Sequence, residues 1–349
     1  MLRFIRATPE DDACLRTLLR EQAMEGWVRV ALTREPSFFA ACRLWGEEWA
    51  VLALEGETLV GMYRIAAQAV HFNGEAHRLG YLGGLRVSPE YRHRLGVLRA
   101  GYASVSGQRG DFQTIPDGWY SVIAADNRVA RRLLEAHLPG LPRYTLCNEF
   151  VTLAISVARA RRHALWQMVT TPQQLMDLCA FYNRQSRCYQ FSPVLTPEAA
   201  RHSGARFFAT TRQNGEIAGC MALWNQQTCK QIHITGYRPP LAALLPLYNF
   251  WADRTRRVRL PPPGACLDQC YLAFFAIEEA ERVPALIEDA LSLTDARVLS
   301  FGLHAAHPTL PALLKKFRPI QYRSCLYAVS FDEPLPLDGR PAQPEAAVL

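Results

Sequence analysis

The sequence predicts a mixed α/β (α+β) fold that is built twice from the same unit. Residues 3–22 and 166–185 each read as a short strand, a Thr-Pro pair and an amphipathic helix. Residues 49–61 and 207–219 each read as two strands joined by a turn that contains Gly-Glu. Because the elements follow the same order in both copies, we expect two tandem domains. Each should be a mixed, mostly antiparallel twisted sheet with helices on both faces.

The two copies also end alike, and this sets the expected domain boundaries. The spacing Tyr-x-x-Cys precedes a strand both at Tyr144 and at Tyr322. We therefore expect an N-terminal domain over residues 1–155 and a C-terminal domain over residues 165–332, joined by a short basic connector. Residues 333–349 are rich in proline and aperiodic, which predicts a flexible tail.

Local signals place the remaining elements in order. The threonine of a Thr-Pro pair can cap the free amides of a helix that proline can begin, so Thr8 and Thr171 predict helix starts. After the first hairpin we expect a strand over residues 81–87, a helix over 96–105 and a strand over 120–124, followed by a further helix and the last strand of the copy.

The second copy differs from the first by an insertion of about 30 residues before its next strand. The insertion contains a helical stretch, 241–257, that ends in an arginine cluster formed by Arg254, Arg256, Arg257 and Arg259. These arginines could contact anions, or they could be a solvated helix end, where cations are favoured.

Composition favours a globular protein without a membrane span. Of 349 residues, 49% are hydrophobic and 20% are charged, and no apolar run reaches the roughly 20 residues that cross a bilayer. The N-terminus lacks the apolar segment of a signal peptide. Ten scattered cysteines suit a reducing compartment, so we expect a cytoplasmic protein without a membrane partner. The net charge of +7 suits an anionic ligand, but no motif predicts a nucleic-acid partner.

One segment combines a strand, an arginine-rich turn and a helix start. The strand ends at Val87, and the turn contains Arg92 and Arg94. A helix N-terminus offers unpaired amides and a positive dipole end, and arginine is a planar partner for phosphate. The segment therefore predicts a phosphate site, although an ordinary strand-to-helix connection with a solvated basic face would have the same residues.

Two motifs of the first copy resemble the signatures of the GNAT N-acetyltransferase superfamily. The first signature is a strand ending in valine, then x-P-x-x-R-x-x-G-x-G and a helix; it is met by Val87, Pro89 and Arg92. Leu95 and Val97 replace its glycines, with Gly96 between them. The second signature is N-x-x-A-x-x-L-Y-E, in which Leu134 replaces the tyrosine; it is met by Asn127, Ala130, Leu133 and Glu135.

This resemblance implies an acyl-CoA site in the first copy. Backbone groups at the end of the strand would pair with the pantetheine arm as an added strand does, and the turn would cradle the pyrophosphate. Gly96 would supply the backbone freedom that the missing glycines give in the family. The residues expected to bind the coenzyme are Leu85, Arg86, Val87, Arg92, His93, Arg94, Leu95, Gly96, Val97 and Asn127.

The second copy lacks both motifs and resembles a degenerate partner. Three carboxylates that would repel a pyrophosphate follow its equivalent strand: Glu278, Glu279 and Glu281. His304 and His307 stand where the second signature would lie. They could form a metal or base site or belong to a simple turn, and because two histidines alone complete no metal site, we expect no metal.

Direct transfer of an acyl group to an amine needs a base for the ammonium proton and an acid for the leaving thiolate. The family's acid would occupy the position of Leu134, which has no proton to donate, and we predict that Tyr144 replaces it. His71 lies on the hairpin where the resemblance places the acceptor, and it is the predicted base. Less supported candidates are Tyr120, Cys147, His77 and Glu149.

These features predict an acyl-CoA-dependent N-acyltransferase, most simply an N-acetyltransferase that uses acetyl-CoA as co-substrate and a small-molecule amine as acceptor. The degenerate second copy would shape the substrate cleft or the face of a homodimer. The alternative is a non-catalytic acyl-CoA-binding sensor or interaction module built on decayed transferase domains, which the missing tyrosine and glycines favour. A nucleic-acid binder rests on the arginine clusters alone.

Overall fold

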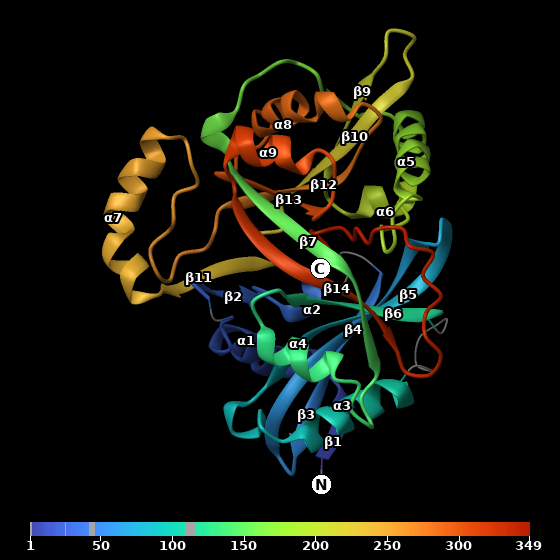
Figure 1. Ribbon diagram of the computed structural model, residues 1–349, viewed down its shortest axis with the longest axis vertical. Coiled ribbons are helices and arrows are strands. Elements are labelled where there is room, and N and C mark those ends of the chain that lie inside the picture. The colour runs from blue at the N-terminus through green and yellow to red at the C-terminus, as the bar shows by residue number, and fades with distance from the viewer. Residues whose placement is uncertain (1, 25, 42–45, 109–115) are drawn as a thin grey trace.

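The computed structural model describes residues 2–24, 26–41, 46–108 and 116–349 (Figure 1). The first half of the chain contains β1 (Leu2–Arg6), α1 (Asp12–Glu21), β2 (Val28–Thr33), α2 (Phe38–Ala41), β3 (Glu47–Glu55), β4 (Thr58–Phe72), β5 (Glu75–Val87), α3 (Leu95–Gln108), β6 (Gly118–Ala124), α4 (Arg128–Glu135) and β7 (Arg143–Ser156). The second half contains β8 (Gln167–Met168), α5 (Pro172–Ser186), α6 (Pro197–His202), β9 (Arg206–Thr211), β10 (Ile217–Trp224), β11 (Gln231–Tyr237), α7 (Pro239–Arg254), β12 (Gln269–Ile277), α8 (Val283–Leu291), β13 (Val298–His304), α9 (Leu310–Phe317) and β14 (Ile320–Ser330).

Twelve strands form one sheet in the order β1-β3-β4-β5-β6-β14-β7-β13-β12-β10-β9-β8. The order read from the β1 edge matches the order read from the β8 edge, strand for strand. Among the described strands, the parallel pairs are β5 with β6 and β12 with β13, which occupy equivalent places in the two halves. The predicted fold class, a mixed and mostly antiparallel twisted sheet with helices, is therefore confirmed, and the sequence repeat is also a structural repeat.

The two halves exchange their last strands at the centre of the sheet. β7 ends the first copy along the chain but pairs with β13, whereas β14 ends the second copy but pairs with β6. The two exchanged strands also pair with each other along all 11 residues of β14, and they cross the middle of the molecule side by side (Figure 1). The boundaries predicted at residues 155 and 165 thus mark a repeat along the chain, and the sheet itself is shared.

The Thr-Pro pairs lie at helix starts. Thr171 Oγ1 accepts a hydrogen bond of 3.2 Å from Gln174 N, and α5 begins at Pro172. In the first copy, Thr8 and Asp11 form the equivalent capping box, with Pro9 opening a 3₁₀ turn ahead of α1. β2 was not expected from the sequence; it pairs with β11 as a separate two-stranded ribbon that joins the copies.

The helices cover both faces of each half. α1 packs on one face of the first half through Leu15, and α3 and α4 pack on the other face through Val105 and Leu134. In the second half, α5 packs on one side through Leu178, while Leu286 of α8 belongs to a separate core that includes β13. Burial of these apolar side chains fixes each helix to the sheet.

Each half contains a fork, where two parallel strands pair briefly and then separate. β5 and β6 pair over residues 79–82 of β5, and β12 and β13 pair over residues 269–271 of β12. Each fork lies beside a β-bulge that gives one residue a left-handed backbone. This residue is Gly84 in the first half, with φ +63°, and Phe274 in the second, with φ +50°. The two bulges occupy equivalent registers against β4 and β10.

The C-terminal segment, 333–349, was expected to be flexible, and the structure corrects this. Its backbone is hydrogen-bonded to Gln190, which donates to Pro341 O and accepts from Gln343 N, both at 2.9 Å. Ala342 is fully buried among apolar side chains of the first half and Phe191. The proline-rich composition excluded regular structure here, but the alanine side chains of the segment are still buried: Ala342, Ala346 and Ala347.

The end of this segment occupies the fork of the second half. Glu345 Oε2 accepts a hydrogen bond of 2.7 Å from Phe274 N, the amide of the bulge. Burial raises the pKa of Glu345 to about 7. Lys230 lies nearby, donating to Leu349 O at 2.6 Å, and burial lowers its pKa to about 8. The chain itself therefore supplies an oxygen acceptor to the second bulge amide.

The exchanged strands lead to a prediction about cleavage of the connector. When a protease site is placed at the exposed residues 161–162 and cut, we expect both fragments to stay together under native conditions, because β7 of one fragment lies between β13 and β14 of the other. Native size-exclusion chromatography, with a denaturing gel to confirm the cut, measures this. Elution as two separate folded domains would contradict the exchange.

The buried Glu345 carboxyl leads to a second prediction. Its ordinary pKa of 4.5 is raised to about 7, so the folded state holds the proton more tightly than the unfolded state, and stability is lost as pH rises from about 4.5 through about 7. Glu345→Gln keeps an acceptor for Phe274 N but does not titrate. We expect the variant to gain free energy of unfolding relative to the wild type across this window, measured by urea denaturation. Glu333→Gln, at an exposed site, is the control. A difference independent of pH would contradict the burial of a titrating carboxyl.

Candidate functional site

The fork of the first half gathers the predicted coenzyme-binding residues. β5 continues to Val87 and β6 continues to Ala124, but their ladder stops at Leu82 and Ser121. Beyond this point the two strands expose backbone groups toward each other. Strand edges with free amides and carbonyls pair readily with an extended ligand, as the pantetheine arm would be.

The bulge at Gly84 shapes this edge. Arg64 of β4 is aligned with Gly83, and Met62 with Arg86, so Gly84 and Leu85 have no partner in the register. A side chain at Gly84 would place its Cβ 2.6 Å from Arg64 Nε, and φ is +63°. Glycine is therefore required here for both conformation and space, and it leaves the bulge amide accessible.

The turn after β5 forms a cradle of amides. Ser88 begins a 3₁₀ turn, Pro89–Tyr91, and α3 starts at Leu95. The amides of Arg94 and Val97 donate to Tyr91 O and Arg94 O, at 3.0 and 2.9 Å. Within the described part of the chain this leaves the amides of His93, Leu95 and Gly96 for a ligand. A Cβ on Gly96 would meet nothing within 4 Å, so the space above it is open.

Two arginines stand beside this cradle. Arg92 is exposed, and its Nε donates to Val87 O at 3.1 Å, which holds the side chain over the strand end. Arg94 stacks over the ring of Tyr91 at 4.6 Å and lies 3.8 Å from Glu55. The N-terminus of α3, the open space at Gly96 and the two arginine side chains can together bind a pyrophosphate.

The second signature forms the opposite side of the fork. Asn127 Oδ1 accepts from Ala130 N at 3.2 Å and caps α4, so the structure gives Asn127 a capping role. Leu134, on the same helix, is buried in the apolar cluster that also holds Tyr144. The position of the family's tyrosine thus belongs to the same buried cluster as Tyr144, the residue that we predicted as its replacement.

Tyr144 lies at the base of the fork within a group of hydroxyls. Its hydroxyl is 2.8 Å from that of Tyr102 and within hydrogen-bonding reach of Ser121. Ser121 Oγ in turn donates to Leu82 O at 2.8 Å, at the last paired position of β5 and β6. Burial raises the pKa of Tyr144 to about 12, so this hydroxyl stays protonated and can act as a donor.

The structure does not bring His71 to the fork. His71 pairs with Ala76 near the turn of the hairpin, whereas the fork begins at Leu82, opposite Ile65. Six residues of extended strand separate Ile65 from His71, which is about 20 Å. His71 is buried, its backbone joins the segment at Phe191, and burial lowers its pKa.

An ionic cluster that the sequence analysis missed lies on the other face of β4. Glu48 Oε1 accepts from Arg64 Nη1 at 2.6 Å and from Arg34 Nη2 at 2.9 Å. Arg64 also lies against Gly84 of the bulge. No motif marks these residues, because a charged residue in a predicted hairpin strand is usually solvent-facing.

The remaining candidates lie elsewhere or have structural partners. Glu278 pairs with Arg212 at 2.6 Å, and burial raises the pKa of Cys147 to about 11, which leaves it an inert thiol. The rings of His304 and His307 are 5.1 Å apart, and burial lowers the pKa of both. Over residues 2–24, 26–41, 46–108 and 116–349 no group of three or more metal-binding side chains occurs. No described helix is long and apolar enough to span a membrane.

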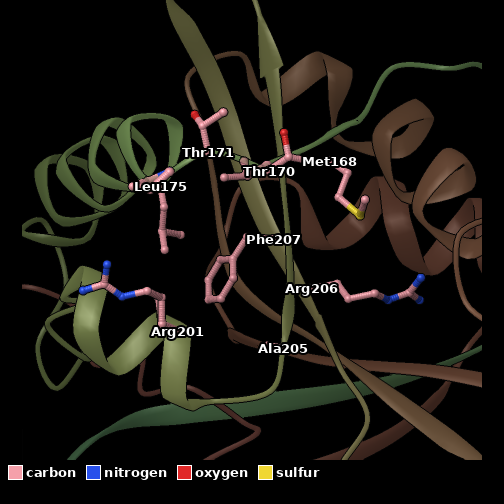
Figure 2. Close-up of a pocket in the computed structure, with 11 residues that line it drawn as sticks. Met168, Thr170, Thr171, Leu175, Arg201, Ala205, Arg206 and Phe207 are labelled. Atoms are coloured by element: carbon pink, nitrogen blue, oxygen red, sulfur yellow. The ribbon is translucent and has the colours of Figure 1, made fainter.

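A separate pocket of about 350 Å³ lies in the second half between α5, α6 and the β8–β9 edge. Figure 2 shows Leu175 and Phe207 along its wall, with Arg201 and Arg206 on either side. None of the predicted site residues lines it. It belongs to the copy whose fork is occupied by Glu345, and we do not place the coenzyme there.

Comparisons with known proteins agree with this geometry. Residues 21–100 match the acetyltransferase (GNAT) domain family, and no curated protein matches the sequence. The fold is similar to that of N-myristoyltransferase of Saccharomyces cerevisiae with bound myristoyl-CoA, with TM-score 0.61 and 11% identity over 95% of this chain and 80% of that chain. It is also similar to a GCN5-related N-acetyltransferase from Anabaena variabilis, with TM-score 0.52 and 13% identity over 93% and 72%. The resemblance found in the sequence is therefore confirmed: residues 21–100 match a GNAT acetyltransferase domain, and the fold is similar to that of a solved GCN5-related N-acetyltransferase.

Proposed function

We propose that the protein is an acyl-CoA-dependent N-acyltransferase that binds its co-substrate in the fork between β5 and β6. The observation that carries this proposal is the contrast between the two bulges. In the second half the bulge amide of Phe274 already holds the carboxylate oxygen of Glu345 at 2.7 Å. In the first half the equivalent residue is Gly84, which has no partner on β4. The internal repeat thus supports Gly84 N as the donor to a thioester oxygen.

Each part of the fork has a chemical role in this proposal. The turn at residues 92–97 binds the pyrophosphate, and the edge of β5 at residues 85–87 pairs with the pantetheine. The amine nitrogen attacks the thioester carbon, negative charge grows on the carbonyl oxygen facing Gly84 N, and the carbon–sulfur bond then breaks. Tyr144 gives its proton to the departing thiolate and can recover one through Tyr102, to which it is hydrogen-bonded.

The ionic cluster suits the acceptor side of the fork. Glu48 is bonded to two arginines that balance its charge, while burial raises the pKa of its carboxyl above the ordinary value. The role proposed for Glu48 is to hold Arg34 and Arg64 in place, and it is not the proposed base. The ammonium proton leaves to water before the attack, and the second N–H proton, which the nitrogen loses as the carbon–sulfur bond breaks, also passes to water. A small-molecule amine is the acceptor that we propose, and acetyl-CoA is the simplest donor. A longer acyl chain is compatible with the similarity to a myristoyl-CoA complex.

Leu134 favours one alternative, a non-catalytic acyl-CoA sensor. Leucine has no proton to donate, so the sensor requires coenzyme binding without transfer. The pKa of an ordinary thiol is about 8.5, so its thiolate is a fair leaving group. For this reason loss of the usual tyrosine does not by itself abolish transfer. Release of free thiol from acyl-CoA in the presence of a broad amine panel separates the two functions.

Binding of the pyrophosphate leads to a test of the site. Arg92→Glu removes a charged phosphate contact, which is worth about 1.5–3 kcal/mol, and we expect acetyl-CoA affinity to fall by about ten-fold or more in calorimetry. Arg297→Glu makes the same charge change at an exposed site of the second half and should leave the affinity unchanged. Equal affinities of both variants would show that the fork is not the site. Two coenzymes bound per chain would contradict a single site.

The proposed acid leads to a test of the chemistry. Tyr144→Phe should lower kcat by about 10²-fold, in the range for general acid catalysis, with KM for acyl-CoA little changed. Tyr120→Phe is the matched control, because Tyr120 lies on β6 next to Ser121 but donates to Gln68 on the other face. Thiol release measures both. A Tyr144→Phe variant as fast as the wild type would remove Tyr144 from the mechanism, and binding without any thiol release would favour the sensor.

A further inference from the structure

The insertion of the second copy contains a helix with an unusual surface. α7 has 16 residues, PPLAALLPLYNFWADR, and its first 14, residues 239–252, carry no charge. It lies at the edge of the molecule, beyond the ribbon of β2 and β11, and is the outermost helix on that side (Figure 1). A helix at the surface of a globular protein ordinarily has charged and polar residues on its outer face.

The polar side chains in this uncharged part of α7 face the rest of the protein, and several of its apolar side chains face away from it, which is the opposite of an ordinary surface helix. The two polar side chains among residues 239–252 are used on the inner side, where Tyr248 donates to Val258 O at 3.1 Å and Asn249 donates to Leu260 O at 3.0 Å. Leu241 and Leu245 pack beside them on the ribbon. Because the protein satisfies these polar groups, only apolar side chains remain for the outer face.

The outer face, which we call the α7 face, consists of Leu244, Leu247, Phe250 and Trp251. Their exposed fractions are 56%, 64%, 56% and 42%. The spacing of three, four and seven residues places Leu244, Leu247 and Trp251 on one side of the helix. Trp27, 61% exposed, adds to this surface near the start of α7, where Trp27 O accepts from Arg238 N at 3.1 Å.

Arginines frame the α7 face at both ends. Arg238 lies over the ring of Trp27 at 5.5 Å, Arg254 over Phe250 at 3.8 Å and Arg257 over Trp251 at 4.3 Å. A small pocket of about 70 Å³ follows at the C-terminal end, lined by Arg159, Arg161, Arg256, Glu288, Lys316 and Phe317. Its acidic member, Glu288, is paired with Lys316 at 2.7 Å, so the pocket keeps an excess of positive charge.

We propose that α7 is an interfacial helix that lies flat on an anionic membrane, with the α7 face among the lipid chains and the flanking arginines at the lipid phosphates. Leucine, phenylalanine and tryptophan on one face with arginines around it are the composition of such helices. Sixteen residues make a helix about 24 Å long, which suits a position in the plane of the interface. This mode needs no spanning segment, and it proposes a membrane partner where none was expected from the sequence.

The positive charge around the α7 face distinguishes between two possible occupants, a second copy of the chain and an anionic lipid surface. A second copy would bring its own arginine frame against the first, with repulsion between like charges. An anionic lipid surface instead attracts each arginine by about 1 kcal/mol, and it accepts a convex helix without a complementary groove. The proposal does not depend on the acyl-transfer chemistry, because no residue of the fork takes part.

The test is co-sedimentation of the full chain with vesicles of phosphatidylglycerol and phosphatidylcholine, and with vesicles of phosphatidylcholine alone. We expect binding to the anionic vesicles, weakened by added salt. Leu247→Asp combined with Phe250→Asp should abolish it, and Arg256→Gln should weaken it about five-fold. Val129→Asp, at an exposed site of α4, is the matched control and should bind as the wild type does.

Three results would overturn the proposal. The first is a wild type that does not bind anionic vesicles at low salt. The second is a double variant that binds as well as the wild type while retaining its melting temperature. The third is a dimer in light scattering that the double variant dissociates, which would assign the α7 face to a contact between two copies.

Discussion

The pairing of β7 with β14 is the constraint on which the rest of the structure depends. These strands complete each other's half and run together along 11 residues at the centre of the sheet. β7 lies between β13 and β14 of the second copy, and β14 lies between β6 and β7 of the first copy, so neither half of the sheet is complete alone. The same exchange places the two forks on either side of the paired strands β7 and β14. The C-terminal segment packs against both halves beside these strands.

The two forks have the same backbone but different chemistry. Both have a bulge residue with a left-handed backbone, Gly84 in one and Phe274 in the other. Phe274 N is held by Glu345 of the same chain, and acidic residues follow its strand. In the first fork, the turn that follows the strand contains Gly96, which has open space above it, and the two arginines Arg92 and Arg94. An anionic, extended ligand is therefore favoured in the first fork and opposed in the second, and this asymmetry is the basis of the proposed function.

The sequence predicted features that are local along the chain. Threonine caps, the hairpins and the strand–turn–helix at Val87 follow from neighbouring residues, and the structure contains them. Strand exchange could not be predicted, because β7 and β14 carry the same pattern and either can pair with β6. The packed tail was missed because proline-rich composition gives no information about a groove formed by distant strands. His71 was placed near the acceptor from its hairpin, but the sequence does not specify which end of a long hairpin faces the fork. The Glu48 cluster arises from three segments and has no motif.

The central claim is that the chain has one acyl-CoA site, in the fork between β5 and β6. Hydrogen–deuterium exchange with and without saturating coenzyme A tests it most directly, because it reports both forks in the same experiment. The account predicts protection of amides in residues 83–97 and no change in residues 274–286. Protection of the second fork, or of both forks equally, would contradict the account.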